Sequence, residues 1–293
     1  MKKILVTGCN GQLGKAINRV YAKDSVEFIN TDVMDSDTSI ALDIANLEEV
    51  IKLAEEAKPD VIINCAAYTA VDACEQNWDL AYRINAIGPR NLSIAANKVG
   101  AKLIHVSTDY VFAGDGEKPY TEFDEVCPKS AYGKTKLEGE RFVEKFAEKY
   151  FIVRTAWLYG EGKNFVKTML RLSETNEEIT VVHDQIGSPT SAMELARMIR
   201  HIESTENYGL FHGTCEGLCS WADFTREIFG LTQKNTKVKN ITSEEYATMY
   251  PAAARRPAYS VLDNYMLHLT TDYKMADWKT AIAEYIGSGL YQM

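Results

Sequence analysis

The chain of 293 residues is 46% hydrophobic and 25% charged, an ordinary globular composition that excludes a disordered chain, a collagen and a disulfide miniprotein. Its 41 acidic and 32 basic residues give a net charge of −9, so we expect no nucleic acid partner, because phosphate contacts need a basic surface. The longest apolar runs, such as residues 61–63, fall far short of the ~20 residues that span a bilayer. The sequence therefore predicts a cytoplasmic protein with no membrane segment.

Short apolar runs alternate with helical patterns in the first half of the chain. Strands are expected at residues 2–7, 26–30, 61–64, 103–107 and 151–155. Helices are expected up to about residue 21, from residue 46, at 78–99 and at 130–149. Continuous apolar strands that alternate with helices indicate a parallel sheet that is buried on both faces. The predicted fold class is α/β, with a Rossmann-type doubly wound parallel sheet over residues 1–155.

The alternating pattern loosens after residue 155. Short strands at 179–182 and 208–212 mix with helices at about 190–203 and 220–230 and with proline-containing loops. No repeat, low-complexity tract or Gly/Ser linker separates the two halves. We therefore expect residues 156–293 to form mainly a smaller C-terminal α/β domain, with some segments that return to the first domain.

A glycine turn follows the first expected strand and opens a helix. Its glycines are Gly8, Gly11 and Gly14, a spacing that permits a tight turn and a close approach of the backbone to a pyrophosphate. The N-terminus of the following helix offers free N–H groups to phosphate. A carboxylate at the end of the second strand, Asp32, can bind the ribose hydroxyls of NAD. A generic strand–helix turn and an ordinary strand-end aspartate are the alternatives, and the nearby Lys15 leaves NADP open as well.

A second group of residues points to proton transfer. Tyr132 and Lys136 are four residues apart in a helical stretch, so they share a face. A nearby ammonium is expected to lower the pKa of a tyrosine toward the working range. Thr108, at the end of the fourth strand, would bring a hydroxyl to the same substrate oxygen. The pair alone recurs by chance on surface helices, but its position after the glycine turn and this strand end favours catalysis.

The combined motifs resemble the extended short-chain dehydrogenases/reductases and, within them, the dTDP-4-dehydrorhamnose reductase family. The segments that carry this resemblance lie at residues 8–14, 59–64, 67–72, 107–112, 132–140, 154–160, 164–170, 184–190 and 255–257. It extends over nearly the whole chain and is firmest for residues 1–190. It implies an NADPH- or NADH-dependent reduction of the C4 keto group of dTDP-4-dehydro-6-deoxy-L-mannose to dTDP-L-rhamnose.

The resemblance also implies roles for individual residues. Tyr132 would donate the proton, Lys136 would hold the nicotinamide ribose, and Thr108 would bind the substrate carbonyl oxygen. The implied cofactor contacts are Gly8, Gly11, Gln12, Leu13, Gly14, Asp32, Asp43, Ile44, Ala66, Ala67, Tyr68, Tyr132 and Lys136. The implied substrate contacts are Thr108, Trp157, Asn164 and Arg256. For the last three, a core aromatic, a helix cap and a surface charge are the respective alternatives.

Other readings of the chain stay open at this point. The substrate could be a related nucleotide 4-keto sugar, or the chain could be a non-enzymatic regulatory subunit of a methionine adenosyltransferase, a role known among relatives of this family. Some members dimerise around a magnesium ion held by a glutamate just after the third glycine, where this chain has Lys15 and Ala16. We therefore expect no metal, and either a monomer or a homodimer. The six cysteines lack a repeating spacing and are expected to be free thiols.

Overall fold

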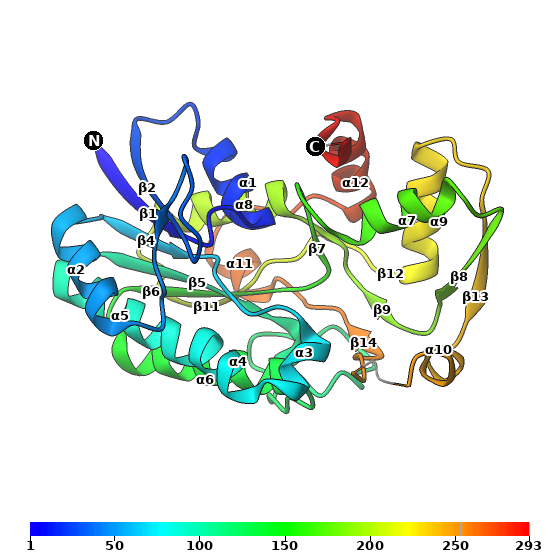
Figure 1. Ribbon diagram of the computed structural model, residues 1–293, viewed down its shortest axis with the longest axis horizontal. Coiled ribbons are helices and arrows are strands. Elements are labelled where there is room, and N and C mark those ends of the chain that lie inside the picture. The colour runs from blue at the N-terminus through cyan, green and yellow to red at the C-terminus, as the bar shows by residue number, and fades with distance from the viewer. Residues whose placement is uncertain (252–253, 293) are drawn as a thin grey trace.

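The computed structural model describes residues 1–251 and 254–292, and its centre is a seven-stranded parallel sheet (Figure 1). The strand order is β11-β6-β5-β4-β1-β2-β3. The strands are β1 (Lys2–Thr7), β2 (Val26–Asp32), β3 (Ile40–Ala41), β4 (Val61–Asn64), β5 (Lys102–Thr108), β6 (Tyr150–Thr155) and β11 (Gly209–His212). The expected α/β class is confirmed, and so are the five strands expected in the first half.

Helices cover both faces of this sheet. On one face lie α1 (Gln12–Val20) and α8 (Ala192–Glu203), which pack against each other, and on the other lie α2 (Leu47–Ala57), α5 (Gly88–Val99) and α6 (Ala131–Phe146) (Figure 1). Successive side chains of a strand point to opposite faces. Ile4 accordingly belongs to the apolar cluster beneath α1 and α8, whereas Leu5 belongs to the cluster beneath α2 and α5. The uninterrupted apolar strands thus supply both cores.

The long helix expected at residues 78–99 is present, with a π-helical turn inside it. It consists of α4 (Trp78–Tyr82), a π-helical turn η1 (Arg83–Ile87) and α5, which follow one another without a gap and with helical backbone at both junctions. Pro89 comes directly after the π-helical turn, and because it has no N–H, one bond of the regular helical ladder is missing there. The helix expected at 130–149 is present as α6 but ends earlier, at Phe146. Short π-helical turns of this kind are frequent at functional sites.

The second half of the chain contributes to both parts of the molecule. The edge strand β11 and helix α8 belong to the sheet domain, and α11 (Tyr265–Thr270) packs beside β11. The remainder forms a lobe at the right of Figure 1, with its own apolar core around Val166, Phe224 and Ile282. The larger elements of this lobe are α7 (Phe165–Ser173), β8 (Glu178–Val182), α9 (Trp221–Leu231), β13 (Lys237–Ile241), α10 (Ser243–Met249) and α12 (Trp278–Gly287).

Short elements connect the two parts. Two-residue strands pair as β10 (Thr190–Ser191) with β7 (Leu158–Tyr159), and as β12 (Cys219–Ser220) with β9 (Ile186–Gly187) and β14 (Tyr259–Ser260). Three further helical segments are α3 (Val71–Gln76), η2 (Asp109–Val111) and η3 (Leu290–Gln292). Among the described residues, no helix is both long and apolar enough to cross a membrane.

Candidate active site

The glycine turn lies at the point where the strand order reverses, between β1 and its neighbours β2 and β4. Gly8 has φ +66°, and a Cβ atom there would lie 2.8 Å from the backbone N and Cα of Ala66. A side chain at Gly14 would collide with the backbone of Gly8 and Cys9. Helix α1 begins after Gly11, and no side chain caps it. The turn is therefore a bare backbone cradle at a helix N-terminus, which fits the pyrophosphate of a dinucleotide.

Three further cofactor candidates are Asp32, Asp43 and Ile44. Asp32 ends β2, and its carboxylate accepts hydrogen bonds from the backbone N–H groups of Asn10, 3.1 Å away, and Val33, 2.8 Å away. The carboxylate therefore fixes the turn to the end of β2. Asp43 is exposed and accepts the N–H of Ala45 at 2.9 Å. Ile44 is buried and packs close to Gly88 in the first turn of α5, so its side chain serves the core and not the surface.

The backbone of the loop after β4 is fixed by hydrogen bonds to Asn85, a residue that the sequence reasoning missed. Asn85, buried in the π-helical turn η1, accepts the N–H of Tyr68 at 2.8 Å and donates to the Tyr68 carbonyl at 3.1 Å. It also donates to the Thr135 hydroxyl on α6 at 3.2 Å. Ala66, Ala67 and Tyr68 are all partly exposed. The small residues of this loop thus face outward beside the glycine turn, and the amide of Asn85 fixes their backbone to the helix that carries Tyr132.

Tyr132 and Thr108 come together at the carboxyl end of β5. Tyr132 lies in the first turn of α6, which Ser130 caps by accepting the N–H of Gly133 at 3.1 Å. The loss of water around its hydroxyl raises the pKa of Tyr132, and a hydrogen bond with Thr108 offsets part of that rise. Its ring packs edge-on against Tyr110 with ring centroids 5.4 Å apart. Tyr132 therefore keeps its proton at neutral pH, as a proton donor must.

The expectation that Lys136 lowers the pKa of Tyr132 is not what this structure shows. Lys136 is 2% exposed, and its ammonium donates to the Val106 carbonyl at 2.6 Å and lies 3.5 Å from Nε2 of His105. Burial lowers the pKa of Lys136 to about 8. The lysine therefore holds its own proton loosely, a consequence of burial that sequence spacing does not reveal.

Asp109 is a buried carboxylate that sequence reasoning passed over. It is 5% exposed, and its Oδ1 accepts the hydroxyl proton of Thr108 at 2.9 Å. Burial raises the pKa of Asp109 to about 6, against hydrogen bonds from Ser260 and Thr108 that lower it. The residue orients the hydroxyl of Thr108, and only its position directly after Thr108 could have drawn attention to it.

Trp157 lies at the junction of the two parts of the molecule. Its backbone has φ +49°, and its ring stacks on Trp221 with centroids 3.5 Å apart and an interplanar angle of 7°. A side chain at Gly187 would collide with this ring. Trp157 is partly exposed, although Trp221 covers one face of its ring and Gly187 lies against it.

The two remaining substrate candidates are already engaged. Asn164 accepts the N–H of Lys167 at 3.0 Å as the cap of α7, and it donates to the hydroxyl of Tyr285 at 3.1 Å. This geometry favours the helix-cap reading of Asn164. Arg256 pairs with Asp72 of α3: one guanidinium nitrogen, Nη2, donates to both carboxylate oxygens, at 2.9 and 3.0 Å. The Asp72 carboxylate is more than half exposed, so an anionic ligand can compete for the guanidinium.

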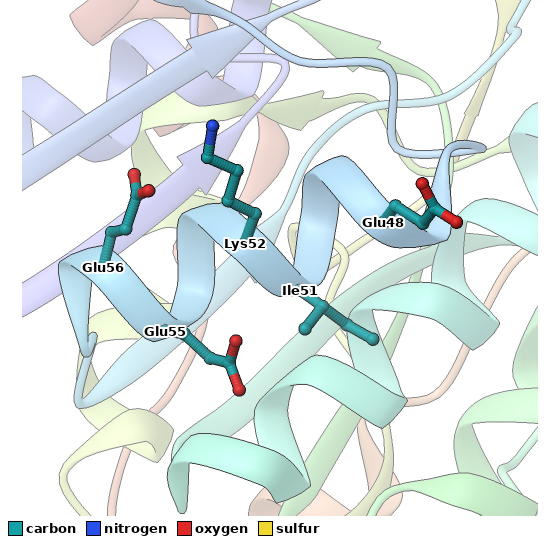
Figure 2. A pocket seen from close by; sticks show the side chains of 5 residues that line it. All are labelled: Glu48, Ile51, Lys52, Glu55 and Glu56. Atoms are coloured by element: carbon teal, nitrogen blue, oxygen red, sulfur yellow. The ribbon is translucent and has the colours of Figure 1, made fainter.

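Other surface features lie apart from this site. Figure 2 shows a depression on the outer surface whose lining comes from the single helix α2, from Glu48, Ile51, Lys52, Glu55 and Glu56. It shares no residue with the site above. Within residues 1–251 and 254–292, no group of three or more His, Cys, Asp or Glu side chains could hold a metal ion. All six cysteines are free thiols, as expected.

Comparison with known proteins places the chain in a family. Residues 1–290 match the RmlD substrate binding domain. The chain belongs to the RmlD substrate-binding domain family. Among curated members of similar length, the spore coat polysaccharide biosynthesis protein SpsK of Bacillus subtilis (strain 168) is 39% identical over 287 residues. The alignment spans 98% of this chain and 97% of SpsK.

Solved structures of this family superimpose over almost the whole chain. A dTDP-4-dehydrorhamnose reductase from Clostridium acetobutylicum ATCC 824 is 56% identical and superimposes with a TM-score of 0.93, covering 99% of this chain and 100% of that one. A dTDP-4-dehydrorhamnose reductase from Bacillus anthracis str. Ames, solved in complex with NADP, is 42% identical with a TM-score of 0.91, covering 98% and 99%. The RmlD fold is thus shared from end to end.

Proposed function

We propose that this RmlD-family chain is an NAD(P)H-dependent oxidoreductase that reduces the C4 keto group of dTDP-4-dehydro-6-deoxy-L-mannose to dTDP-L-rhamnose. The observation that carries the proposal is the meeting of Thr108 and Tyr132 at the end of β5, beside buried Lys136 and close to the bare glycine cradle. Full-length similarity to two dTDP-4-dehydrorhamnose reductases, one of them solved with NADP, supports the same activity.

The chain offers a continuous surface for the cofactor. The glycine turn and the first N–H groups of α1, at Gln12 and Leu13, would hold the pyrophosphate. Asp32 would accept the adenosine ribose hydroxyls, with Asp43 and the Ile44 backbone near the adenine. Ala66 and its two neighbours would line the path to the nicotinamide, and Lys136 would hold the nicotinamide ribose. When bound, the nicotinamide cofactor supplies the hydride that reduces the C4 carbonyl carbon.

The protein's part in the reaction is to supply and control one proton. As the carbonyl becomes an alcohol, charge builds on its oxygen, and the Tyr132 hydroxyl donates a proton to that oxygen. The raised pKa of Tyr132 keeps the proton in place until that moment. The Thr108 hydroxyl donates to Asp109 at 2.9 Å in the ligand-free protein and would turn that proton to the same substrate oxygen to stabilise it. Tyr132 is left as a phenolate that must regain a proton before the next turnover.

The sugar nucleotide would bind between the sheet domain and the lobe. The partly exposed indole of Trp157 would contact the sugar ring, held in place by its stack on Trp221. Arg256 would exchange its exposed partner Asp72 for the diphosphate of the ligand. Asn164 caps α7, so it would affect the substrate site indirectly, by fixing the position of the first turn of that helix. We take residues 1–155 with β11 and α8 as the cofactor-binding part, and the lobe as the substrate-binding part.

A related nucleotide 4-keto sugar is the second candidate substrate. The similarity to a spore coat polysaccharide biosynthesis protein supports it, because such polymers draw on several activated sugars. The reaction type and the roles of the residues would be unchanged. A cytoplasmic location and a monomeric or homodimeric state complete the proposal.

The proposal is tested by steady-state oxidation of NADPH and of NADH with a panel of dTDP-4-keto-6-deoxy sugars. Wild-type protein is expected to consume cofactor only when a keto sugar is present. Tyr132→Phe should lose nearly all turnover and keep cofactor affinity, whereas Tyr246→Phe, an exposed tyrosine of α10, serves as the matched control. Full turnover by Tyr132→Phe would refute the role of Tyr132, and no turnover on any keto sugar would refute the proposed function.

A further inference from the structure

A buried chain of polar side chains runs from β1 through β4 and β5 to α6. Its members are Thr7, Asn64, His105 and Lys136, none of them more than 2% exposed. The Thr7 hydroxyl donates to Oδ1 of Asn64 at 2.7 Å, Nδ2 of Asn64 lies 3.0 Å from Nδ1 of His105, and Nε2 of His105 lies 3.5 Å from Nζ of Lys136. Three sheet strands are thus linked to the lysine beside the catalytic tyrosine.

The orientation of the Asn64 amide is fixed by a group that can only donate. The backbone N–H of Ala66 points at Oδ1 of Asn64 at 3.1 Å, and the Thr7 hydroxyl reaches the same oxygen. A flipped amide would set its NH₂ group against the N–H of Ala66 and leave two buried donors facing each other. Nδ2 of Asn64 must therefore be the atom that faces His105.

This orientation fixes the tautomer of His105. Because Nδ2 of Asn64 donates, Nδ1 of His105 accepts, and the neutral ring carries its proton on Nε2. Burial and the Lys136 ammonium both hold the pKa of His105 well below its usual range, so the ring stays neutral. The Nε2–H group then faces Lys136, which is itself a donor, to the Val106 carbonyl.

A donor facing an ammonium disfavours the charged lysine, whereas a neutral amine could accept from Nε2–H. The other ionisable groups that act on Lys136 are the Cys65 thiol and the Glu140 carboxylate. Burial keeps Cys65 protonated, with a pKa of about 12. Glu140 is held by Arg154 in a bidentate pair at 2.7 and 3.0 Å. Cys65 and Glu140 are thus each fixed in one ionisation state. His105 is the neighbour of Lys136 whose effect depends on which ring nitrogen carries the proton.

We propose that His105 is a positioning residue for the reaction: locked by Asn64 with its proton on Nε2, it presents a donor to Lys136 and keeps the lysine proton loosely held. The inference rests on the proposed function, because it concerns the lysine beside the proton donor Tyr132. It assigns a purpose to a histidine that otherwise occupies a fully buried position in a central strand. An apolar side chain there would fill the space without acting on the lysine.

The sharpest test reverses the tautomer. Asn64→Asp keeps an acceptor for Ala66 and Thr7 but replaces the Nδ2 donor by a second acceptor, so the His105 proton should move to Nδ1. Nε2 then becomes an acceptor for the Lys136 ammonium, and the pKa of Lys136 should rise by one unit or more from about 8. Both changes are read in ligand-free protein by NMR of ¹⁵N-labelled histidine and lysine. Asn235→Asp, an exposed asparagine, matches the change in net charge and should move neither signal.

Kinetics supply a readout that a merely structural role would not move. The alkaline limb of the pH dependence of kcat should shift upward in Asn64→Asp with the lysine pKa, while KM for the keto sugar changes little. A proton on Nδ1 of His105 in the wild-type protein would overturn the inference without any variant. So would a rise in the lysine pKa without the tautomer change, because the added charge alone would explain it. If the NMR results are as expected but no keto sugar is turned over, the proposed function fails, whereas the fixed Nε2–H tautomer of His105 and its effect on Lys136 stand.

Discussion

Asp109 gives a quantitative prediction about stability, because burial sets its folded pKa apart from its unfolded one. Its pKa is raised from 3.8 to about 6, so between these values the folded protein binds more protons than the unfolded chain. The free energy of unfolding therefore falls as pH rises through this interval. The full loss of stability from ionising Asp109 is present above about pH 6. A shift of about two units corresponds to roughly 3 kcal/mol. Asp109→Asn removes the buried charge and keeps an oxygen that accepts from Thr108.

The assay is urea unfolding of wild type and Asp109→Asn at about pH 4 and about pH 7.5. The variant should be more stable than wild type by about 2–3 kcal/mol at the higher pH, and the difference should nearly vanish at the lower pH. The exposed Asp37→Asn is the control and should stay within about 0.5 kcal/mol of wild type at both. A stability difference between Asp109→Asn and wild type that is the same at both pH values would refute the reasoning.

Three further predictions follow from the same structure. Gly8→Ala should weaken NADPH binding at least tenfold in a fluorescence titration, because its φ of +66° and its contact with Ala66 leave no room for Cβ; Gly100→Ala, with φ +74° in open space, should leave the affinity unchanged. Glu140→Gln should lower the free energy of unfolding by about 3–5 kcal/mol, because it leaves the Arg154 charge buried and unpaired, and a loss under about 1 kcal/mol would contradict this account of the pair. Trp221→Ala should raise KM for the keto sugar about two- to tenfold through loss of the stack on Trp157, and an unchanged KM would remove Trp157 from the sugar site.

The sheet domain was predictable from sequence because its strands are short, apolar and continuous. Residues 2–7 and 61–64 form strands within the limits that their patterns indicate, and the glycine turn between strand and helix required no tertiary information. The helix at 78–99 was predicted, but the π-helical turn inside it was not. The helical periodicity continues through the π-helical turn η1, and Pro89 directly after it is the local signal of an irregular turn.

Spacing alone was enough to propose Tyr132 and Lys136 as catalytic candidates, and that role stays a prediction; the residues that hold them in place could not be predicted. Tyr132 and Lys136 stand out by their separation in a helix, whereas Asn85 and His105 look like single polar residues within buried elements. Nothing local reveals that Asn85 holds the loop at Tyr68 or that His105 meets Lys136, because these contacts join segments far apart in the chain. The ionisation of the pair was also misjudged from spacing, since burial dominates it.

The central claim is the reduction at C4, and identification of the product tests it most directly. Purified protein, dTDP-4-dehydro-6-deoxy-L-mannose and NADPH carrying deuterium at the transferred position should be followed by proton NMR. The account predicts dTDP-L-rhamnose with deuterium at C4, formed at a rate that collapses in Tyr132→Phe. An unreacted keto sugar, or a product with hydrogen at C4 and deuterium elsewhere, would contradict it.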